Sequence, residues 1–531
     1  MINGLRRAEW HAIALAVAAG LALRLALLVR AGWRYDYDEG MVGLQVLRIL
    51  DGARPVFHPG QPYLGALESY LTAPLFALFG PSAVTLKLVP WLLAGAYIAL
   101  TGWLGVRIFG RRTGALSAVL AALAPAYLLV TGMKTWGATA ETLSLGSLML
   151  VLTTYVTDGA LAPRQRRQAL VALGFVSGVA FWVSWLSAFY IAPVALVLLA
   201  YGRAPLRRWG WGVALAFFAG SLPLWLYNAR HDWATFRFLL SDQGDTWGNA
   251  AAIFDHLRYD LAPRLVSGDP AWRVLSWPAT WWQQIVYQGA LVGLLVFAWR
   301  GRKRSGRAGR KLLALFALVL PLIYWLSGYS NHALNEFGFD ATGRYVLMLH
   351  SVMPVGVAAI ASALARNGGI RRMLAAAIVS SVIALNLLGA TRLDQPRAWA
   401  SPYYVRQPET LTPLIDYLDS QGVRHVWTDV GIAHVLMFET QERILATDWY
   451  DIYGAKGIVR FPEVPLEIAG ADRVAFVEVI LPGQAETPFE QAFEALGVPF
   501  TAARPSSDLL VIIPAHPVDP ALLGDGIGYQ F

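Results

Sequence analysis

Three carboxylates lie close together in the hexapeptide YDYDEG at positions 35–40, directly after the first apolar run of the chain. Adjacent acidic residues often cap the N-terminus of a helix, because their oxygens accept hydrogen bonds from its first N–H groups. A positioned carboxylate can instead act as a general base, which takes the proton of an attacking hydroxyl group. Because further charged residues are predicted at the same membrane level, the chemical interpretation is favoured for Asp36, Asp38 and Glu39.

Two more polar residues follow in the same loop. His58 begins the sequence HPGQPY, whose Pro-Gly pair is typical of a turn, so a solvated surface histidine is the simpler interpretation. Glu68 interrupts an otherwise apolar stretch, LGALESYL. A carboxylate close to lipid is costly unless it is paired or faces a wet cavity. His58 and Glu68 are therefore candidates for contact with a substrate.

Cationic residues occur at positions that the hydropathy pattern places on the outer side of the membrane. Lys134 and Glu141 lie at the turn between two apolar runs, and Arg344 with Tyr345 opens a later run. A basic residue at an outer helix end opposes the positive-inside rule, which indicates a bound anion, and a guanidinium suits phosphate. For Lys134, a side chain that snorkels to the interface is an equal alternative. Arg24 lies inside the first apolar run, where an ion pair with the external carboxylates or binding of the same anion is expected.

Together these residues supply carboxylates, a lysine and an arginine at one rim of a helix bundle. Sugar transfer from a lipid phosphate needs this set: a base for the acceptor hydroxyl and cations for the phosphate leaving group. No nucleotide-binding or hydrolase motif (GxGxxG, P-loop, HExxH, GxSxG) occurs in a suitable context. The chain has no cysteine, which excludes disulfides and a thiolate metal site. No cofactor is implied, and assistance by a divalent metal is left open.

The elements that position these residues follow from composition. Of 531 residues, 56% are hydrophobic and only 15% charged, and the mean hydropathy is +0.46. Soluble domains carry roughly 25% charged residues, so the sequence predicts a multi-pass integral membrane protein. The net charge of +8 comes from short basic clusters between apolar runs, which is no nucleic-acid signature. The preference for Arg over Lys, with abundant Ala and Leu, is typical of a bacterial GC-rich gene.

A spanning helix needs about 20 apolar residues, and eleven stretches qualify. They are residues 11–31, 82–106, 113–131, 138–157, 169–185, 186–202, 209–226, 281–299, 311–328, 345–365 and 371–391. Basic clusters between them place the N-terminus in the cytoplasm and the C-terminus outside. The apolar stretch 169–201 is predicted to be a hairpin that turns near 184–187. External loops are expected at 32–80, 228–279 and 329–343.

Residues 1–392 are thus predicted to form the membrane module, with an amphipathic helix at 38–50 in the membrane interface and a partly sunk helix at 62–79. Residues 393–531 have ordinary composition and predict a soluble domain outside the cytoplasm. Its expected strands are 423–429, 443–447, 473–480 and 508–514, and its expected helices are 409–421, 431–439 and 487–496. Alternating strands and helices predict a small α/β domain with a largely parallel sheet.

The order of these features resembles a known family. An uncleaved first helix, an external Asp-Glu, an external hairpin with Lys and Glu, and a late Gly-Arg-Tyr before a Pro-containing helix are similar to GT-C membrane glycosyltransferases. The resemblance is to the branch of protein O-mannosyltransferases and the lipid A aminoarabinose transferase, over most of residues 1–391. It implies a polyprenyl-phosphate sugar donor, with Asp38 as general base and Glu39 in support. It also implies that Arg344 and Lys134 contact the donor phosphate.

The same resemblance implies a hydroxyl acceptor on protein, lipid or glycan, and a place in the bacterial inner membrane. Arg24 is also expected to bind the donor phosphate. Five further residues are expected to contact the substrates elsewhere: Asp36, His58, Glu68, Glu141 and Tyr345. A transporter or flippase of lipid-linked sugars is the alternative. Transporters tend to carry inverted repeats and broken helices near the bilayer midplane, whereas here the charges gather at the outer rim. A receptor or assembly platform is the third interpretation.

Overall fold

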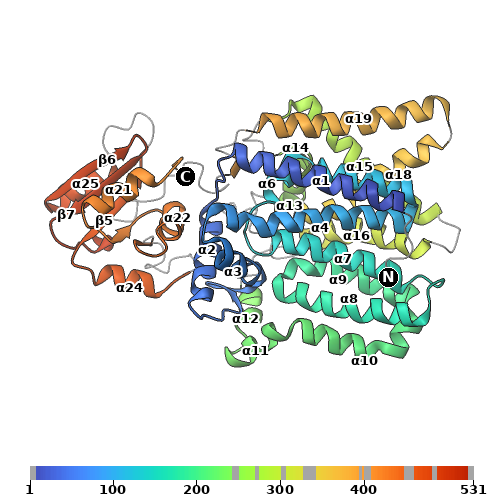
Figure 1. Ribbon diagram of the computed structural model, residues 1–531, viewed down its shortest axis with the longest axis horizontal. Coiled ribbons are helices and arrows are strands. Elements are labelled where there is room, and N and C mark those ends of the chain that lie inside the picture. Colours follow the sequence, from blue (N-terminus) through green and yellow to red (C-terminus); the bar gives the residue numbers. More distant parts are fainter. Residues whose placement is uncertain are drawn as a thin grey trace. The chain divides into compact units, whose positions relative to one another are not determined.

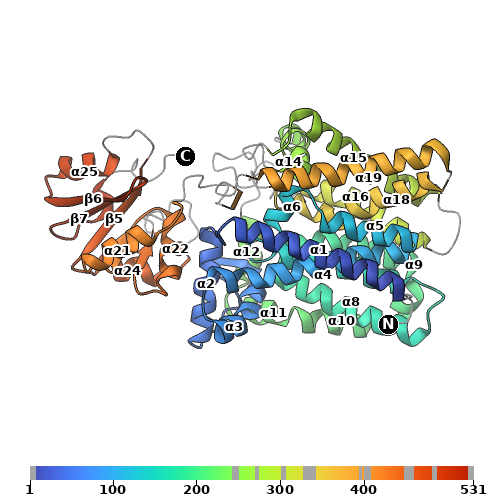
Figure 2. The same ribbon diagram turned by 45° about the horizontal axis from the view of Figure 1, so that its top comes forward.

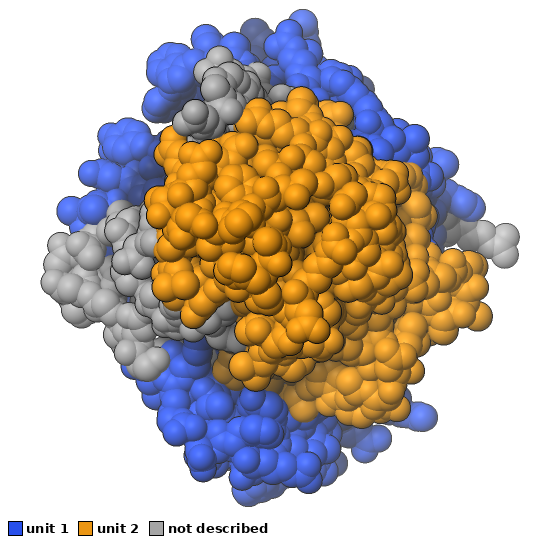
Figure 3. All heavy atoms as spheres, turned by 90° about the vertical axis from the view of Figure 1, so that its left-hand side faces the viewer, with its two compact units in different colours: residues 1–32, 63–65, 87–398 blue, residues 33–62, 66–86, 399–531 orange. Residues whose placement is uncertain are grey.

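The computed structural model of the protein describes residues 7–241, 250–268, 274–300, 306–326, 343–366, 368–393, 398–399, 408–447, 460–480 and 487–523. The chain divides into two compact units. The first comprises residues 1–32, 63–65 and 87–398, and the second residues 33–62, 66–86 and 399–531 (Figure 3). The stretch between the first apolar helix and the second thus groups mainly with the C-terminal residues.

The first unit is helical. Its helices are α1 (Arg7–Arg30), α4 (Ala83–Phe109), α5 (Arg111–Ala122), α6 (Ala126–Thr131), α7 (Thr139–Val156), α8 (Pro163–Val183), η1 (Trp185–Ser187), α9 (Ala188–Tyr201), α10 (Arg203–Gly220), α11 (Leu222–Arg230), α12 (Ala234–Ser241), α13 (Ala250–His256), η2 (Leu257–Leu261), α14 (Ala262–Ser267), α15 (Trp277–Arg300), α16 (Arg307–Leu326), η5 (Val346–Ser351), α18 (Met353–Ala365) and α19 (Gly369–Arg392). The long helices α1, α4, α8, α10 and α19 run nearly parallel to one another (Figures 1 and 2).

Within the described residues, five helical stretches are long and apolar enough to cross a membrane: α1, α4, α16, α19 and the continuous stretch Val346–Ala365. A sixth is reached if α10 and α11, which meet at a bend of 63°, are one broken span. The protein is therefore an integral membrane protein with a mostly helical body. The eleven predicted spans each fall on a helix or on two consecutive helices, but their number stays a prediction.

Breaks in these helices follow local chemistry. The helix is broken where the hairpin turn was predicted, near 184–187, because α8 ends at Val183 and Ser184 adopts an extended conformation before η1. The stretch 113–131 is interrupted where none was predicted. There α5 ends at Ala122 and α6 begins at Ala126, directly after Pro125. Proline favours an extended residue before it and suits the start of a helix, so one helix ends and another begins at this point.

The second unit combines two helices with a sheet domain. Its elements are α2 (Tyr37–Leu50), β1 (Phe57–His58), the start of β2 (Gln61–Gly65, of which residues 63–65 belong to the first unit), α3 (Leu67–Phe79), α21 (Thr412–Ser420), β3 (His425–Trp427), α22 (Val430–Glu439), β4 (Leu445–Thr447), α24 (Glu463–Ala469), β5 (Val474–Val479), α25 (Pro488–Leu496), β6 (Phe500–Ser506), β7 (Leu509–Pro514) and η6 (Pro520–Leu523). The four predicted strands of this domain are confirmed as β3, β4, β5 and β7. The short β1 and β2 form a separate two-stranded sheet.

The prediction of a largely parallel sheet is wrong. The five strands are ordered β4-β3-β5-β7-β6, with β3 parallel to β4 and β5 but β7 antiparallel to β5 and β6. Only residues 507–508 separate β6 from β7, and so short a connection can join only antiparallel strands. The sequence analysis missed β6 because its sequence, FTAARPS, lacks an apolar run and contains a proline. Edge strands such as β6 tolerate proline.

Helix α2 packs closely against α22. A Cβ atom built on Gly40 would lie 3.0 Å from the backbone carbonyl of His434, and one built on Gly43 would lie 2.7 Å from the ring of Phe438. Two glycines one turn apart thus allow close contact between the backbones. Apolar residues of α2, among them Met41 and Leu44, are buried in the hydrophobic core of this unit. The amphipathic face that was expected to contact lipid headgroups is therefore covered by protein.

Candidate active site

The carboxylates at the start of α2 have different surroundings. The Asp36 side chain accepts a hydrogen bond from the backbone N–H of Glu39 at 3.2 Å, and the Glu39 side chain accepts one from the N–H of Asp36 at 3.1 Å. This reciprocal capping box satisfies two N–H groups that a helix N-terminus otherwise leaves without partners. Both side chains are fully buried. Asp36 and Glu39 therefore fix where α2 begins, which is the capping role that the sequence analysis weighed.

Asp38 lies outside the capping box and its side chain is 15% exposed. Its Oδ1 forms an ion pair with Nη2 of Arg460 at 3.4 Å, and Nη1 of Arg460 donates to the carbonyl of Pro59 at 3.1 Å. Arg460 lies 422 positions later in the chain, and sequence reasoning did not identify it. Of the three carboxylates, Asp38 is the one whose oxygen meets a cation from the C-terminal residues in the described structure.

His58 and Glu68 are both buried within the second unit. Burial, with a smaller contribution from the charge of Arg460, lowers the pKa of His58 to about 3, so its ring is neutral at pH 7. Neither ring nitrogen has a hydrogen-bond partner among the described residues. The alternative interpretation of His58 as a solvated surface histidine is therefore wrong. A buried polar group without partners is uncommon, and His58 stays a candidate for contact with a substrate.

A buried amide network ties the elements that carry these residues to α2. The side chain of Gln45 donates to the carbonyl of Phe57 at 2.8 Å and accepts a hydrogen bond from the hydroxyl of Ser69 at 2.7 Å. Phe57 precedes His58 in β1, and Ser69 follows Glu68 in α3. The network therefore holds Asp38, His58 and Glu68 in one framework inside the second unit.

In the first unit, two of the predicted cations converge on one aromatic ring. Nζ of Lys134 lies 5.0 Å from the ring centroid of Trp136, and Cζ of Arg344 lies 5.7 Å from the same centroid. Arg344 also lies over the ring of Tyr345, at 5.3 Å. Lys134 is only 2% exposed, which opposes the snorkelling interpretation. Both cations therefore lie within reach of one aromatic ring, whose electron-rich face attracts positive charge.

Two further cations lie near this pair, and sequence reasoning identified neither. Lys87 in α4 is fully buried, and its Nζ donates to the carbonyl of Met133 at 3.4 Å. Arg264 in α14 packs its stem against Gly343, where an added Cβ would lie 3.3 Å from the arginine Cδ. The signal for Lys87 was present, because a lysine inside a predicted span is costly without a function or partner. Arg264 carried no local signal.

Glu141 lies in the first turn of α7 and is fully buried. Its carboxylate oxygens have no hydrogen-bond partner of good geometry within the described part of the chain. The turn before it contains Gly137 and Ala138, with φ of 62° and 78°; a left-handed residue other than glycine is uncommon. The partial positive charge at the helix N-terminus favours an acidic residue at this position.

Arg24 does not make the predicted ion pair. Its guanidinium donates to the carbonyls of Gly20 and Ala122 at 3.0 Å and to that of Ala121 at 3.4 Å. Ala121 and Ala122 end α5, where helix carbonyls lack partners within the helix. Arg24 therefore joins α1 to the end of α5, which explains a buried arginine without a carboxylate.

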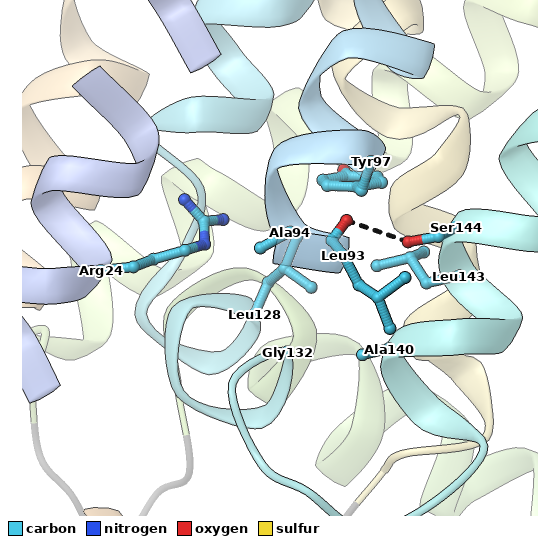
Figure 4. Close-up of a pocket in the computed structure, with 9 residues that line it drawn as sticks. All are labelled: Arg24, Leu93, Ala94, Tyr97, Leu128, Gly132, Ala140, Leu143 and Ser144. Atoms are coloured by element: carbon cyan, nitrogen blue, oxygen red, sulfur yellow. Dashed lines mark hydrogen bonds between the residues drawn. The ribbon is translucent and has the colours of Figure 1, made fainter. Parts of the chain in front are cut away.

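Beside Arg24 lies a small cavity of about 10 Å³ that Tyr97 and Ser144 also line (Figure 4). The Ser144 hydroxyl donates to the carbonyl of Leu93 at 3.0 Å. A cavity of this volume holds about one water molecule, so it is too small for a phosphate or a sugar. Among the described residues, no group of three or more histidine or acidic side chains is arranged to hold a metal ion.

The comparison with known proteins identifies the fold. No protein-family model and no curated protein matches the sequence. Two solved structures of ArnT from Cupriavidus metallidurans are similar to the protein. The structure bound to undecaprenyl phosphate covers 98% of this chain and all of its own, with a TM-score of 0.61 and 14% identity. The apo structure covers 94% and 97%, with a TM-score of 0.57 and 15% identity.

An oligosaccharyltransferase of Archaeoglobus fulgidus, tethered with an acceptor peptide, is also similar. It covers 88% of this chain and 68% of its own, with a TM-score of 0.54 and 13% identity. The resemblance to GT-C enzymes in the order of the sequence features is thus matched in three dimensions, over the membrane helices and the C-terminal sheet domain together. The chain has the fold of the GT-C membrane glycosyltransferases over nearly its whole length.

Proposed function

We propose that the protein transfers a sugar from a polyprenyl-phosphate donor to a hydroxyl acceptor on the outer face of the membrane. The observation that carries this proposal is the convergence of Lys134 and Arg344 on Trp136 in a chain with a GT-C fold. Two cations beside one ring suit a phosphate that carries one negative charge in the donor and gains a second as it leaves, and a structure of the same fold is bound to undecaprenyl phosphate. Loss of a phosphate leaving group is favoured where its developing charge meets fixed cations.

In this proposal the phosphate is held by Arg344 and Lys134. Arg344 supplies a planar fork that can donate two parallel hydrogen bonds, while Lys134 supplies a compact charge. Lys87, which is also buried beside Met133, adds positive potential. Arg24 is left out of the site because its terminal nitrogens donate to backbone carbonyls.

Asp38 is the proposed general base. Its carboxylate takes the proton of the acceptor hydroxyl while the sugar anomeric carbon bonds to that oxygen and the phosphate departs with the electron pair. Asp36 and Glu39 support it through the capping box, because that box fixes the first turn of α2 and hence the direction of the Asp38 side chain. His58, Glu68, Glu141 and Tyr345 are proposed to contact the sugar or the acceptor.

The proposed setting is the bacterial inner membrane, with eleven spans, a cytoplasmic N-terminus and residues 393–531 outside the cytoplasm. This topology puts Asp38, Lys134 and Arg344 on the outer side, where a lipid-linked sugar would be presented. Its support is the distribution of basic clusters along the sequence.

The test uses purified protein in liposomes with labelled undecaprenyl-phosphate sugars and a membrane extract as the source of acceptors. Wild type should move label from the lipid to an acceptor, and Lys134→Ala and Arg344→Ala should each lower the rate strongly. Arg258→Ala is the matched control, because Arg258 lies over Tyr259 at 5.0 Å in an exposed cation–aromatic pair of the same unit. Label that crosses the bilayer while still attached to lipid would instead identify a transporter.

A further inference from the structure

The C-terminal residues and the helix that carries Asp38 belong to one compact unit. In addition to the close packing at Gly40 and Gly43, polar contacts join this helix to the C-terminal residues. The Tyr35 hydroxyl donates to Glu439 at 3.3 Å, and Arg48 forms ion pairs with Glu442, at 2.7 Å, and with Glu463. All of these contacts are made away from the Asp38 carboxylate.

Arg460 differs from these contacts because it touches Asp38 itself. Its guanidinium is shared between two partners: Nη1 donates to the carbonyl of Pro59 and Nη2 to Oδ1 of Asp38. Pro59 precedes Gly60, whose φ of +68° places the turn in a conformation that suits glycine. The carbonyl of this turn therefore anchors the guanidinium, and the anchored guanidinium constrains the carboxylate.

Charges around Asp38 make Arg460 electrostatically important. Asp36 and Glu39 on the same helix, and Glu68 on α3, are acidic and oppose a further negative charge in this unit. His58 in β1 and His434 in α22 cannot compensate, because burial lowers the pKa of each to about 3 and leaves both rings neutral. Arg460 is thus the cation that contacts Asp38 among the described residues of this unit.

We infer that Arg460 is a positioning residue for the general base: through it the C-terminal domain orients the Asp38 carboxylate. This inference rests on the proposed function. It assigns the C-terminal domain a direct part in the transfer step, beyond that of a folded appendage. It also requires the domain to be docked on α2 for the base to be competent.

The experiment compares three substitutions of Arg460 with a matched control in full-length protein in liposomes. Arg460→Ala removes both hydrogen bonds, Arg460→Gln retains an amide donor without the charge, and Arg460→Lys retains the charge without the fork. Arg48→Ala is the control, because it removes ion pairs between the same helix and the same domain that do not involve Asp38. For each variant, kcat, the donor KM, the pH profile and the melting temperature are measured.

Arg460→Ala and Arg460→Gln should lower kcat at least tenfold with little change in donor KM, and Arg460→Lys should recover part of the rate. The acidic limb of the rate profile should move to higher pH in Arg460→Gln, because the ionised carboxylate loses its neighbouring cation. Arg48→Ala should lower the melting temperature at least as much while leaving kcat nearly unchanged. In an Asp38→Asn background, Arg460→Ala should have no further effect on rate.

Two outcomes overturn the inference while wild type transfers sugar. In one, Arg460→Ala and Arg460→Gln keep the wild-type kcat and pH profile. In the other, activity falls in parallel with melting temperature in both the Arg460 and the Arg48 variants, which makes the contact merely structural. If wild type itself transfers no sugar from any donor, the proposed function is what fails.

Discussion

The close contact between α2 and α22 gives a prediction whose size can be worked out from the structure. A Cβ atom on Gly43 would lie 2.7 Å from two ring carbons of Phe438 and 3.0 Å from a third. Carbon atoms prefer separations of about 3.5–4.0 Å, so the helices must separate by nearly 1 Å. Phe438 cannot rotate away easily, because it is buried between Tyr35 and Phe76, with ring centroids 5.6 Å and 5.9 Å away.

Gly43→Ala should therefore destabilise the second unit by about 1–3 kcal/mol, the usual cost of overpacking. Alanine also favours helix over glycine by up to about 1 kcal/mol, which would hide part of the effect. Gly289→Ala removes this ambiguity, because Gly289 lies inside α15 with no atom within 4 Å of an added Cβ. The difference between the two variants isolates the clash.

The assay is thermal unfolding in detergent, together with sugar transfer. Each kcal/mol shifts the melting temperature of a unit of this size by roughly 2–4 °C, so Gly43→Ala should melt roughly 2–12 °C below Gly289→Ala. Transfer should fall as well, because α2 carries Asp38. Equal melting temperatures in the two alanine variants would refute the close packing of α2 on α22.

The other predictions concern charge and topology. Arg344→Lys should lower activity and Arg344→Ala should lower it further, by about 10²–10³-fold, with intact insertion; unchanged donor binding in Arg344→Ala would shift the phosphate role to Lys134. Burial lowers the pKa of His434 to about 3 in the folded protein, whereas an unfolded histidine has a pKa of about 6.5. Between these two pH values the unfolded state binds more protons than the folded state. The free energy of unfolding therefore decreases as the pH falls from about 6.5 to about 3. His434→Gln should reduce this slope by about 1.4 kcal/mol per pH unit, and an unchanged slope in denaturation measured against pH would contradict the buried neutral ring. A reporter active only outside the cytoplasm should be active after Phe531 and silent in the loop at 304–307, and the reverse pattern would put every proposed site residue in the wrong compartment.

Local patterns in the sequence predicted most of the helices. Apolar runs located the membrane helices, and polar Ser184 marked the break between α8 and α9. The spacing of Asp36 and Glu39 is that of a capping box, so these residues carried a local structural signal. The sheet was predicted less well, since the antiparallel β6 has an exposed, Pro-containing sequence that resembles a loop.

Contacts between distant parts of the chain could not be predicted. Arg460 meets Asp38 across 422 positions, and nothing in its own neighbourhood indicates that partner. The amphipathic pattern of α2 predicted a helix in the membrane interface. A helix that packs its apolar face into a protein core has the same pattern, so the sequence alone could not distinguish the two environments. The convergence of Lys134 and Arg344 on Trp136 likewise depends on helix packing, although each cation by itself was anomalous enough to be noticed.

The most direct test of the account is sugar transfer by Asp38→Asn. The amide keeps the shape of the side chain and can still meet Arg460 through its oxygen, but it cannot take a proton. Loss of a general base typically costs about 10²–10⁴-fold, so transfer should be nearly abolished with normal expression and donor binding. Asp36→Asn should weaken the capping box and lower the stability of the protein, with a smaller effect on the rate of sugar transfer. Transfer by Asp38→Asn at near the wild-type rate would contradict the assignment of the base, and if Asp38→Asn and Asp36→Asn both remain fully active, the proposed glycosyltransferase mechanism loses its catalytic carboxylate.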